Sequence, residues 1–245
     1  MAAVPEVELS PRWQEAQAAE SSYWEHLGAA ELLRISAEKP SFITDAGVGL
    51  FQDKRIIELG VGPLGVSVVS FRPATVKIKS LVKVDPLPQM MVTDVVGEAG
   101  GWEGELATLV WKLAQEGEYL CLAAEQMGLR DSADTVVIYN VLDHVSDPLR
   151  VLRTAHQALV PGGHVAVAVD CYSWVGRLRH ELITRRRNPD SILVRAHPFT
   201  FVVSHVARLI RQAGFDEPLV RRVPSRLVRL VGQHHRPVFV ASKVS

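Results

Sequence analysis

"IIELGVGPLG" (residues 56–65) predicts a buried strand that runs directly into a glycine-rich loop. The β-branched residues at its start favour the strand, and Gly60, Gly62 and Gly65 follow with the spacing G-x-G-x-x-G. Glycines at this spacing let the backbone turn tightly and approach a bound nucleotide or nucleoside. The spacing alone fits more than one such ligand, so the surrounding segments have to identify both the fold and the ligand.

Strand-like and helix-like segments alternate along the rest of the chain. The predicted strands are 55–60, 80–85, 118–123, 134–140, 164–170, 218–223 and 236–242, and the predicted helices are 102–116, 147–159 and 202–213. This alternation predicts an α/β fold, a Rossmann-like, doubly wound and mostly parallel sheet with helices on both faces. Asp147 and Pro148 mark the start of the helix at 147–159, and the "PGG" at 161–163 is expected to end it.

The residues before the first strand predict an N-terminal helical extension. Trp13, Tyr23 and Trp24 recur at mostly helical spacings within 11–36. We expect three parts along the chain: a helical extension or lid over 1–50, a ligand-binding domain over 51–245, and a substrate-lid insertion near 171–198 within that domain.

Length and composition favour one core of good size. The chain has 245 residues, of which 47% are hydrophobic. It has no run of about 18 apolar residues to span a bilayer and no signal-like start, so we expect a cytoplasmic protein without a membrane span. Cys121 and Cys171 each lie beside a predicted strand and are expected to be buried thiols.

Charge is unevenly distributed although the formal net charge is zero. Residues 1–60 carry ten acidic and five basic residues, whereas residues 171–245 carry fourteen basic and four acidic ones. Such an asymmetry fits a surface for an anionic partner, and it also fits solvated helix faces. A net charge of zero argues against nucleic acid as the main partner.

Two acidic residues narrow the choice of ligand for the glycine loop. Glu58 lies at the end of the first strand, where a carboxylate suits an ammonium group better than a pyrophosphate. Asp85 ends the next strand, where a carboxylate can accept hydrogen bonds from ribose hydroxyls. A ligand with a ribose, an ammonium group and a carboxylate is S-adenosylmethionine.

Five motifs in order carry a family resemblance. "IELGVGPLG", "VDPL", "AAEQMGL", "YNVLDHVSDP" and "LVPGG" resemble the class I S-adenosylmethionine-dependent methyltransferases. The chain is most similar to a bacterial branch with an N-terminal "W..AQ..E..YW" helix, an "NVLDH" turn and a late "HP..F" segment. The resemblance covers residues 12–215 and implies S-adenosylmethionine as cofactor. It also implies a seven-stranded sheet with a terminal antiparallel hairpin.

The resemblance also implies which residues bind the cofactor. Glu58 and the three glycines would surround the methionine moiety, and Asp85 would hold the ribose. The remaining cofactor positions would be Pro86, Leu87, Ala124 and Glu125 around the adenine, and Asn140, Val141 and Leu142 near the methionine portion and the sulfonium. The stretch "LRDSADTVV" departs from the family, because alanine stands at position 133 where an aromatic residue is common. From these roles, Glu58→Ala is expected to weaken cofactor binding and leave the fold intact.

Candidate catalytic residues follow the fourth predicted strand. Asp143 can orient His144 as a general base, although the pair can also serve only to order the start of a helix. His197 is a second candidate base or substrate contact, or simply a loop histidine. Asp143, His144, His197 and His205 could together gather a metal ion, but no ligand pair stands at i, i+3 or i, i+4, so we predict no metal site.

The leading interpretation is an S-adenosylmethionine-dependent methyltransferase that acts on a small molecule or saccharide intermediate, with oxygen favoured over nitrogen as the acceptor atom. Trp174, Leu178 and the arginines of the 171–198 insertion could clamp an anionic acceptor. The alternatives are an RNA methyltransferase, a non-catalytic protein that binds the cofactor, and a nicotinamide-dependent dehydrogenase. Oligomeric state is open, with a homodimer as one option.

Overall fold

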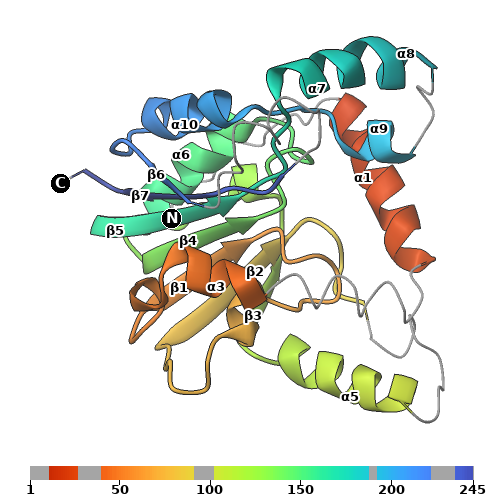
Figure 1. Cartoon of the computed structure of the whole chain (residues 1–245). Coiled ribbons are helices and arrows are strands. Elements are labelled where there is room, and N and C mark those ends of the chain that lie inside the picture. The colour runs from red at the N-terminus through yellow and green to blue at the C-terminus, as the bar shows by residue number, and fades with distance from the viewer. Residues whose placement is uncertain (1–10, 27–39, 91–101, 188–191, 222–234, 245) are drawn as a thin grey trace.

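Seven strands form one mixed sheet in the computed structural model, which describes residues 11–26, 40–90, 102–187, 192–221 and 235–244. The strands lie in the order β3-β2-β1-β4-β5-β7-β6 (Figure 1). Their bounds are β1 Arg55–Leu59, β2 Ser80–Asp85, β3 Glu118–Cys121, β4 Ala133–Tyr139, β5 Leu159–Ala168, β6 Leu219–Arg221 and β7 Val238–Ser242.

Strand direction follows the predicted pattern. The pairs β1–β2, β1–β4, β2–β3 and β4–β5 are parallel, and β7 runs antiparallel to both of its neighbours, β5 and β6. The central strand β4 is almost continuously buried, as its unbroken apolar sequence predicts for a strand covered on both faces. The predicted Rossmann-like sheet with a terminal antiparallel hairpin is therefore confirmed.

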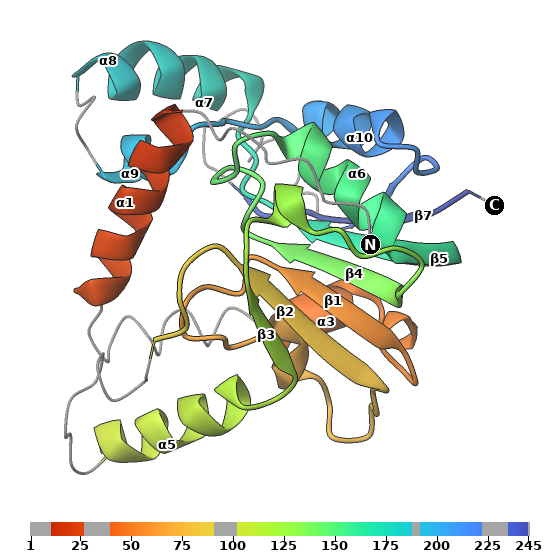
Figure 2. The ribbon, with the colours of Figure 1, turned by 180° about the vertical axis from the view of Figure 1, so that it is seen from behind.

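Helices cover both faces of the sheet. α6 (Pro148–Ala158) and α10 (Val203–Gln212) lie on one face, and α3 (Pro40–Ala46) lies on the other (Figures 1 and 2). α6 begins as predicted, because the Asp147 carboxylate accepts hydrogen bonds from the backbone N–H groups of Leu149 (2.9 Å) and Arg150 (3.1 Å). α5 (Trp102–Ala114) precedes the edge strand β3.

A second group of helices lies beyond the carboxyl ends of the strands. It comprises α1 (Pro11–Glu25), α7 (Trp174–Arg179), α8 (Arg185–Arg187) and α9 (Ile192–Ala196), with α1 packed against α9 (Figure 1). A π-helical turn, η4 (His180–Thr184), joins α7 to α8, and three short 3₁₀ turns occur at η1 (Val48–Leu50), η2 (Val68–Phe71) and η3 (Ala124–Gln126). Because ligands of open α/β sheets bind outside the carboxyl ends of the strands, these helices stand where a cover for the site is needed.

Two structural predictions are wrong in detail. The "PGG" at 161–163 does not end α6, because the helix stops at Ala158 and those residues lie within β5. Leu159 is fully buried and pairs with Ala133, and the register then shifts so that Thr135 pairs with His164, which places the intervening residues in a bulge. Cys171 is buried as expected, but Cys121 is exposed because it lies on the edge strand β3.

The N-terminal region is only partly described. Helix α1 accounts for the first part of the predicted 11–36 helical segment, and residues 27–39 lie outside the described residues. In α3, Phe42 and Ile43 are 1% exposed and pack in the same hydrophobic cluster as strand residues Ile56 and Val137. The division of the chain at residue 50 stays a prediction. None of the described helices is long and apolar enough to cross a membrane.

Candidate functional site

A cavity of about 520 Å³ lies between helix α1 and the carboxyl ends of strands β1, β2, β4 and β5. Most of the predicted site residues line it. These are Glu58, Gly60, Gly62, Asp85, Pro86, Leu87, Ala124, Glu125, Asn140, Val141, His144 and His197. Gly65, Leu142 and Asp143 do not line the cavity, and we describe below what each of them contacts.

The glycine loop leaves β1 in a conformation that favours glycine. Gly60, Gly62 and Gly65 have φ angles of 73°, 80° and 66°, in the left-handed region. The N–H of Gly60 donates to the carbonyl of Val84 (2.7 Å), which ties the loop to β2. Gly65 lies at the far end of the turn, packed against Gln89 and Tyr119, and supports the loop from behind.

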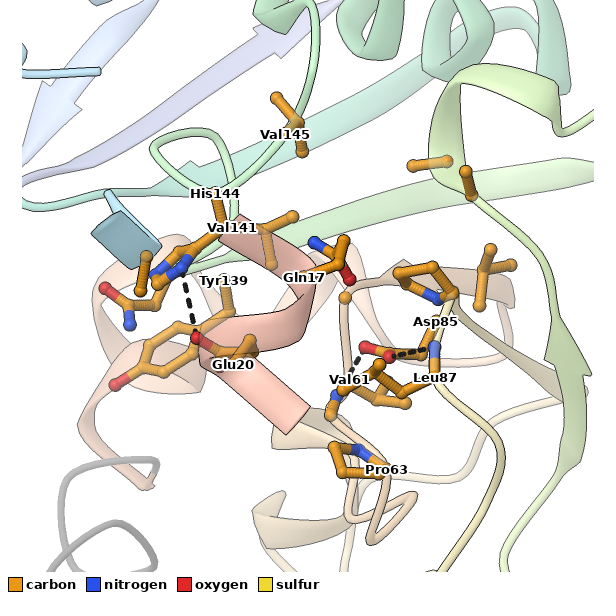
Figure 3. Close-up of a pocket in the computed structure, with 18 of the residues that line it drawn as sticks. Gln17, Glu20, Val61, Pro63, Asp85, Leu87, Tyr139, Val141, His144 and Val145 are labelled. Atoms are coloured by element: carbon orange, nitrogen blue, oxygen red, sulfur yellow. Dashed lines mark hydrogen bonds and ion pairs between the residues drawn. The ribbon is translucent and has the colours of Figure 1, made fainter. Parts of the chain in front are cut away.

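Asp85 holds the loop from the end of β2. Its carboxylate accepts hydrogen bonds from the N–H of Gly62 (2.8 Å) and from the N–H of Leu87 (3.0 Å) (Figure 3). Burial raises the pKa of Asp85 to about 6, although both hydrogen bonds oppose the rise. A carboxylate has about four lone-pair positions, so Asp85, which lines the cavity, can accept further hydrogen bonds.

Glu58 is buried and has a structural role in addition to its place in the cavity wall. It is 2% exposed, and its carboxylate accepts hydrogen bonds from the Ser67 hydroxyl and from the N–H of Val68 (3.0 Å). These contacts hold the first turn of η2. Its negative charge also acts on buried Lys83, where it opposes the lowering of the lysine pKa that burial causes. Glu58 therefore serves the loop structure as well as the cavity.

The wall after β3 is held by a second buried carboxylate. Glu125 is 3% exposed, and its side chain accepts hydrogen bonds from the N–H groups of Ser146 (2.7 Å) and Asp147 (3.3 Å) at the start of α6. The neighbouring Ala124 carbonyl accepts a hydrogen bond from the Thr154 hydroxyl (3.0 Å). The Glu125 side chain thus fixes this loop against the start of α6, and its place near the adenine stays a prediction.

The residue after β4, Asn140, lines the cavity and has a buried polar atom without a hydrogen-bond partner. Asn140 has a φ angle of 57°, lines the cavity, and its Oδ1 is buried without a hydrogen-bond partner. A buried carbonyl oxygen without a partner is costly, so this atom is suited to a ligand donor. Val141 lines the cavity next to it, whereas Leu142 is fully buried in the core below and supports the turn.

Asp143, His144 and His197 converge at one end of the cavity. Asp143 Oδ1 lies 3.8 Å from His144 Nε2, and Asp143 Oδ2 lies 3.7 Å from His197 Nε2. The two imidazole rings are 4.2 Å apart, measured between centroids. Asp143 does not cap α6, because Asp147 fills that position, and the Asp143 carboxylate instead faces the two histidines.

A second carboxylate reaches His144 from helix α1. Glu20 Oε2 lies 3.4 Å from His144 Nδ1 (Figure 3). Glu20 Oε1 accepts a hydrogen bond from the indole N–H of Trp24 (3.0 Å). Burial lowers the pKa of His144, but Asp143, Glu20 and the Ala196 carbonyl together raise it to about 9. The His144 ring is therefore protonated and cationic at neutral pH, as long as no other cation lies beside Asp143 and Glu20.

Helix α1, part of the predicted N-terminal extension or lid, forms a wall of the cavity, but sequence reasoning did not single out the side chains that line it. Trp13, Gln17, Glu20 and Trp24 line the cavity together with Tyr23. Four of them stand at intervals of four, three and four residues, which places them on one face of a helix. This spacing indicates that the four side chains form a stripe along one face of the helix. Only the fold shows that this face lines the cavity. Trp24 packs against the glycine loop, 2.9 Å from the position of a Cβ on Gly62.

Arg236 was also missed, because it follows two histidines in what reads as a solvated turn. Its guanidinium pairs with both carboxylate oxygens of Asp170 (2.9 and 3.2 Å) and donates to the Tyr139 hydroxyl (3.1 Å). All three residues line the cavity. A bidentate pair of this kind is a rigid part of a wall.

The 171–198 insertion contributes less to the cavity than predicted. Among its described residues, Ala196 and His197 line the cavity, and none of its arginines does. Trp174 is 73% exposed and Leu178 is 47% exposed. The expected arginine clamp for an anionic acceptor is therefore not seen in the described part of this segment.

Comparisons with known proteins agree with this geometry. A family profile described as "Methyltransferase domain" matches residues 23–217. No curated protein matches the chain.

Solved structures with the same fold include several methyltransferases. An S-adenosylmethionine-dependent methyltransferase from Thermotoga maritima is 19% identical, with a TM-score of 0.55 over 95% of this chain and 99% of that one. The 1,6-didemethyltoxoflavin-N1-methyltransferase of Burkholderia thailandensis, solved with its substrate and S-adenosylhomocysteine, is 15% identical, with a TM-score of 0.60 over 99% and 95% of the two chains. A phosphoethanolamine N-methyltransferase from Haemonchus contortus is 12% identical, with a TM-score of 0.55 over 85% and 53%.

The family match covers most of the chain, and the order and directions of the strands agree with a methyltransferase fold. The chain is thus an enzyme of the methyltransferase-domain family, with S-adenosylmethionine as its cofactor, and belongs to the class I S-adenosylmethionine-dependent methyltransferases.

Proposed function

We propose that this enzyme transfers the methyl group of S-adenosylmethionine to an oxygen atom of a small molecule or saccharide intermediate. The proposal rests on one observation: a single cavity is lined by different kinds of side chains at its two ends (Figure 3). Asp85 and the glycine loop stand at one end and suit the cofactor. His144 and His197, backed by Asp143, stand at the other end and suit a polar acceptor.

The cofactor roles belong to the same proposal. Asp85 accepts hydrogen bonds from the ribose hydroxyls, and Glu58 faces the ammonium group. Pro86, Leu87 and Ala124 pack near the adenine, together with the backbone of Glu125. The free Oδ1 of Asn140 accepts a hydrogen bond from the methionine portion, with Val141 beside the sulfonium. Gly60 and Gly62 let the backbone come close, and Gly65 and Leu142 support the two loops.

The transfer itself needs position more than a strong base. An oxygen lone pair of the acceptor attacks the methyl carbon, the C–S bond breaks, and its electron pair stays on sulfur in S-adenosylhomocysteine. The hydroxyl proton leaves toward solvent through the polar groups at the acceptor end, Asp143, His144 and His197. Holding the two reacting atoms in line within one cavity supplies most of the rate gain.

The acceptor is expected to be neutral and polar rather than anionic. Acidic side chains dominate the charged part of the cavity wall, and Arg236 is already paired with Asp170. The Burkholderia neighbour is an N1-methyltransferase, so the fold also accommodates transfer to nitrogen. The acceptor atom therefore has to be identified by analysis of the methylated product.

Product analysis tests the acceptor. The enzyme is incubated with S-adenosylmethionine labelled with ¹³C in the methyl group and with pools of sugars, sugar nucleotides, phenols, amines and RNA. Oxygen-, nitrogen- and carbon-bound methyl groups have separate ¹³C shifts. We expect an O-methyl signal on a low-molecular-weight product. An N-methyl or C-methyl signal, or label in the RNA, would contradict the proposal.

Exchanging Glu58 for glutamine should weaken cofactor binding and also destabilise the fold. The variant keeps one acceptor oxygen, but it loses the negative charge that faces the ammonium group and compensates Lys83. Hydrogen bonds to charged groups are worth about 1.5–3 kcal/mol, so we expect roughly tenfold weaker binding and a loss of about 1–3 kcal/mol in unfolding free energy. Calorimetry with S-adenosylhomocysteine and urea unfolding measure the two effects.

The matched control is Glu118→Gln on the exposed part of β3, which should change neither quantity. The earlier expectation that Glu58 acts on the cofactor alone predicts weaker binding with unchanged stability. Unchanged binding in the Glu58 variant would remove Glu58 from the proposed cofactor site.

A further inference from the structure

We propose that Asp143, His144 and His197 form a binding site for a divalent transition-metal ion at the acceptor end of the cavity. Metal binding itself does not depend on the reaction, whereas the ion's role in catalysis rests on the proposed function. The fold brings these residues together from two separate places, the turn after β4 and the segment after α9.

The spacing of the three side chains suits a shared ion better than direct contact. One ligand atom from each residue lies within 4.8 Å of the others. The carboxylate oxygens of Asp143 lie 3.8 and 3.7 Å from the histidine nitrogens, beyond the length of an N–H···O hydrogen bond. Metal–nitrogen and metal–oxygen bonds are about 2.0–2.2 Å long, so an ion between the groups would bridge these gaps after small side-chain movements.

The Asp143 carboxylate is buried, and one of its oxygens accepts no hydrogen bond. The Asp143 side chain is 6% exposed, and its Oδ1 has no hydrogen-bond partner. An ionised carboxylate without full compensation is costly in a protein interior.

Glu20 supplies the outer contact that metal-binding histidines usually have. Its Oε2 lies 3.4 Å from His144 Nδ1, while His144 Nε2 is the nitrogen nearer to Asp143. A carboxylate on the second ring nitrogen fixes the tautomer and the orientation of a metal-bound imidazole. Glu20 comes from helix α1, so this contact also links the cavity wall to the proposed site.

Two imidazoles and one carboxylate suit ions such as Zn²⁺, Co²⁺ or Fe²⁺. Three protein ligands leave coordination positions open, and these face the cavity because His144 and His197 both line it. An acceptor hydroxyl bound there would lose its proton at a lower pH, because the ion stabilises the alkoxide. The site would then favour oxygen acceptors that coordinate the ion.

The structure also provides a matched control. His205 is the fourth residue that sequence reasoning grouped with these three, but its ring packs 5.5 Å from that of Phe201 and it does not belong to the cluster. Its removal deletes a histidine from the same chain without touching the proposed ligands.

Metal titration of the full chain tests the site. Chelator-treated protein without a purification tag is titrated with Co²⁺ by absorption spectroscopy and with Zn²⁺ by calorimetry. We expect one equivalent to bind, with visible absorption bands from Co²⁺. His197→Ala and Asp143→Asn should weaken binding more than about 100-fold, and Glu20→Gln by about tenfold, in line with the 10- to 100-fold effects of outer contacts. His205→Ala should bind as the wild type does.

Two outcomes would overturn the site, and both can be separated from a failure of the proposed function. The first is that neither ion binds to wild-type protein that still binds S-adenosylhomocysteine. The second is that His205→Ala weakens binding as much as His197→Ala. If the ion binds but the methylated product carries an N-methyl group, the metal site stands and the proposed function fails. Circular dichroism of each variant shows whether it has folded.

Discussion

Gly60→Ala is expected to abolish cofactor binding and to destabilise the protein strongly. Gly60 has a φ angle of 73°, and a Cβ at this position would lie 2.1 and 2.7 Å from the two methyl carbons of Val141. Left-handed backbone costs a residue with a Cβ about 1–2 kcal/mol, and forced overpacking adds about 1–3 kcal/mol. Val141 also lines the cavity, so its displacement disturbs the proposed sulfonium contact.

Gly162→Ala measures the cost of the left-handed backbone alone, without the clash that a Cβ at position 60 makes with Val141. Gly162 has the same φ angle of 73°, but no atom lies within 4 Å of its Cβ position. We expect this variant to lose about 1–2 kcal/mol of unfolding free energy and to keep full cofactor affinity. The double variant Gly60→Ala/Val141→Ala should recover part of the stability. Urea unfolding and calorimetry with S-adenosylhomocysteine give both quantities, and equal losses in the two single variants would contradict the clash.

Asp85→Asn is expected to weaken cofactor binding by about 10- to 100-fold. The carboxylate accepts hydrogen bonds from Gly62 and Leu87, and its remaining lone pairs are proposed to hold the ribose hydroxyls. Hydrogen bonds to a charged group are worth about 1.5–3 kcal/mol, and each 1.4 kcal/mol is a factor of ten in affinity. Asp53→Asn is the control, because Asp53 is exposed, lies before β1, and has a φ angle of 55° that asparagine tolerates.

The same residue gives cofactor binding a pH dependence. Burial raises the pKa of Asp85 to about 6, and the ionised form is the better acceptor for hydroxyl groups. The affinity for S-adenosylhomocysteine should therefore rise between about pH 5 and pH 7 and level off above that range. Asp85→Asn should remove this rise. A wild-type affinity that stays constant across the range would show that Asp85 does not contact the cofactor.

In the absence of cofactor, the contribution of Asp85 to the unfolding free energy should fall as the pH rises, whereas the cofactor affinity should increase. The pKa of Asp85 in the folded protein is above the ordinary value of about 4, so the folded state binds the proton more tightly than the unfolded chain does. Between about pH 4 and pH 6 the contribution of Asp85 to the unfolding free energy therefore falls as the pH rises. The difference in unfolding free energy between wild type and Asp85→Asn, measured at several pH values, isolates this contribution.

Local patterns were sufficient for the fold and for the half of the cavity that we propose to bind the cofactor. The alternation of apolar strands and amphipathic helices specifies a parallel sheet, because each segment has to bury its apolar face against its neighbours. Gly60 and Asp85 follow strands directly, and the carboxyl ends of parallel strands meet at one edge of the sheet. Their proximity therefore follows from chain order alone, and the structure places Asp85 2.8 Å from the loop N–H of Gly62.

Strand ends were less predictable, because they depend on pairing between strands. The "PGG" at 161–163 has the composition of a helix stop, yet buried Leu159 pairs with Ala133 and draws these residues into a bulge of β5. The exposure of Cys121 likewise depends on β3 being the edge strand of the sheet, which no local pattern specifies.

The sequence by itself determined the sheet, the family, and the positions of Gly60 and Asp85, because each depends on short-range periodicity and on chain order. Only the tertiary structure brought Glu20 of α1 and His197 after α9 to His144, and only it excluded His205. Those contacts join segments more than fifty residues apart in the chain. They arise from how helices pack beyond the sheet, which depends on three-dimensional shape. The spacing of residues along α1 indicates a stripe on one helix face, but it does not identify the surface that this stripe contacts.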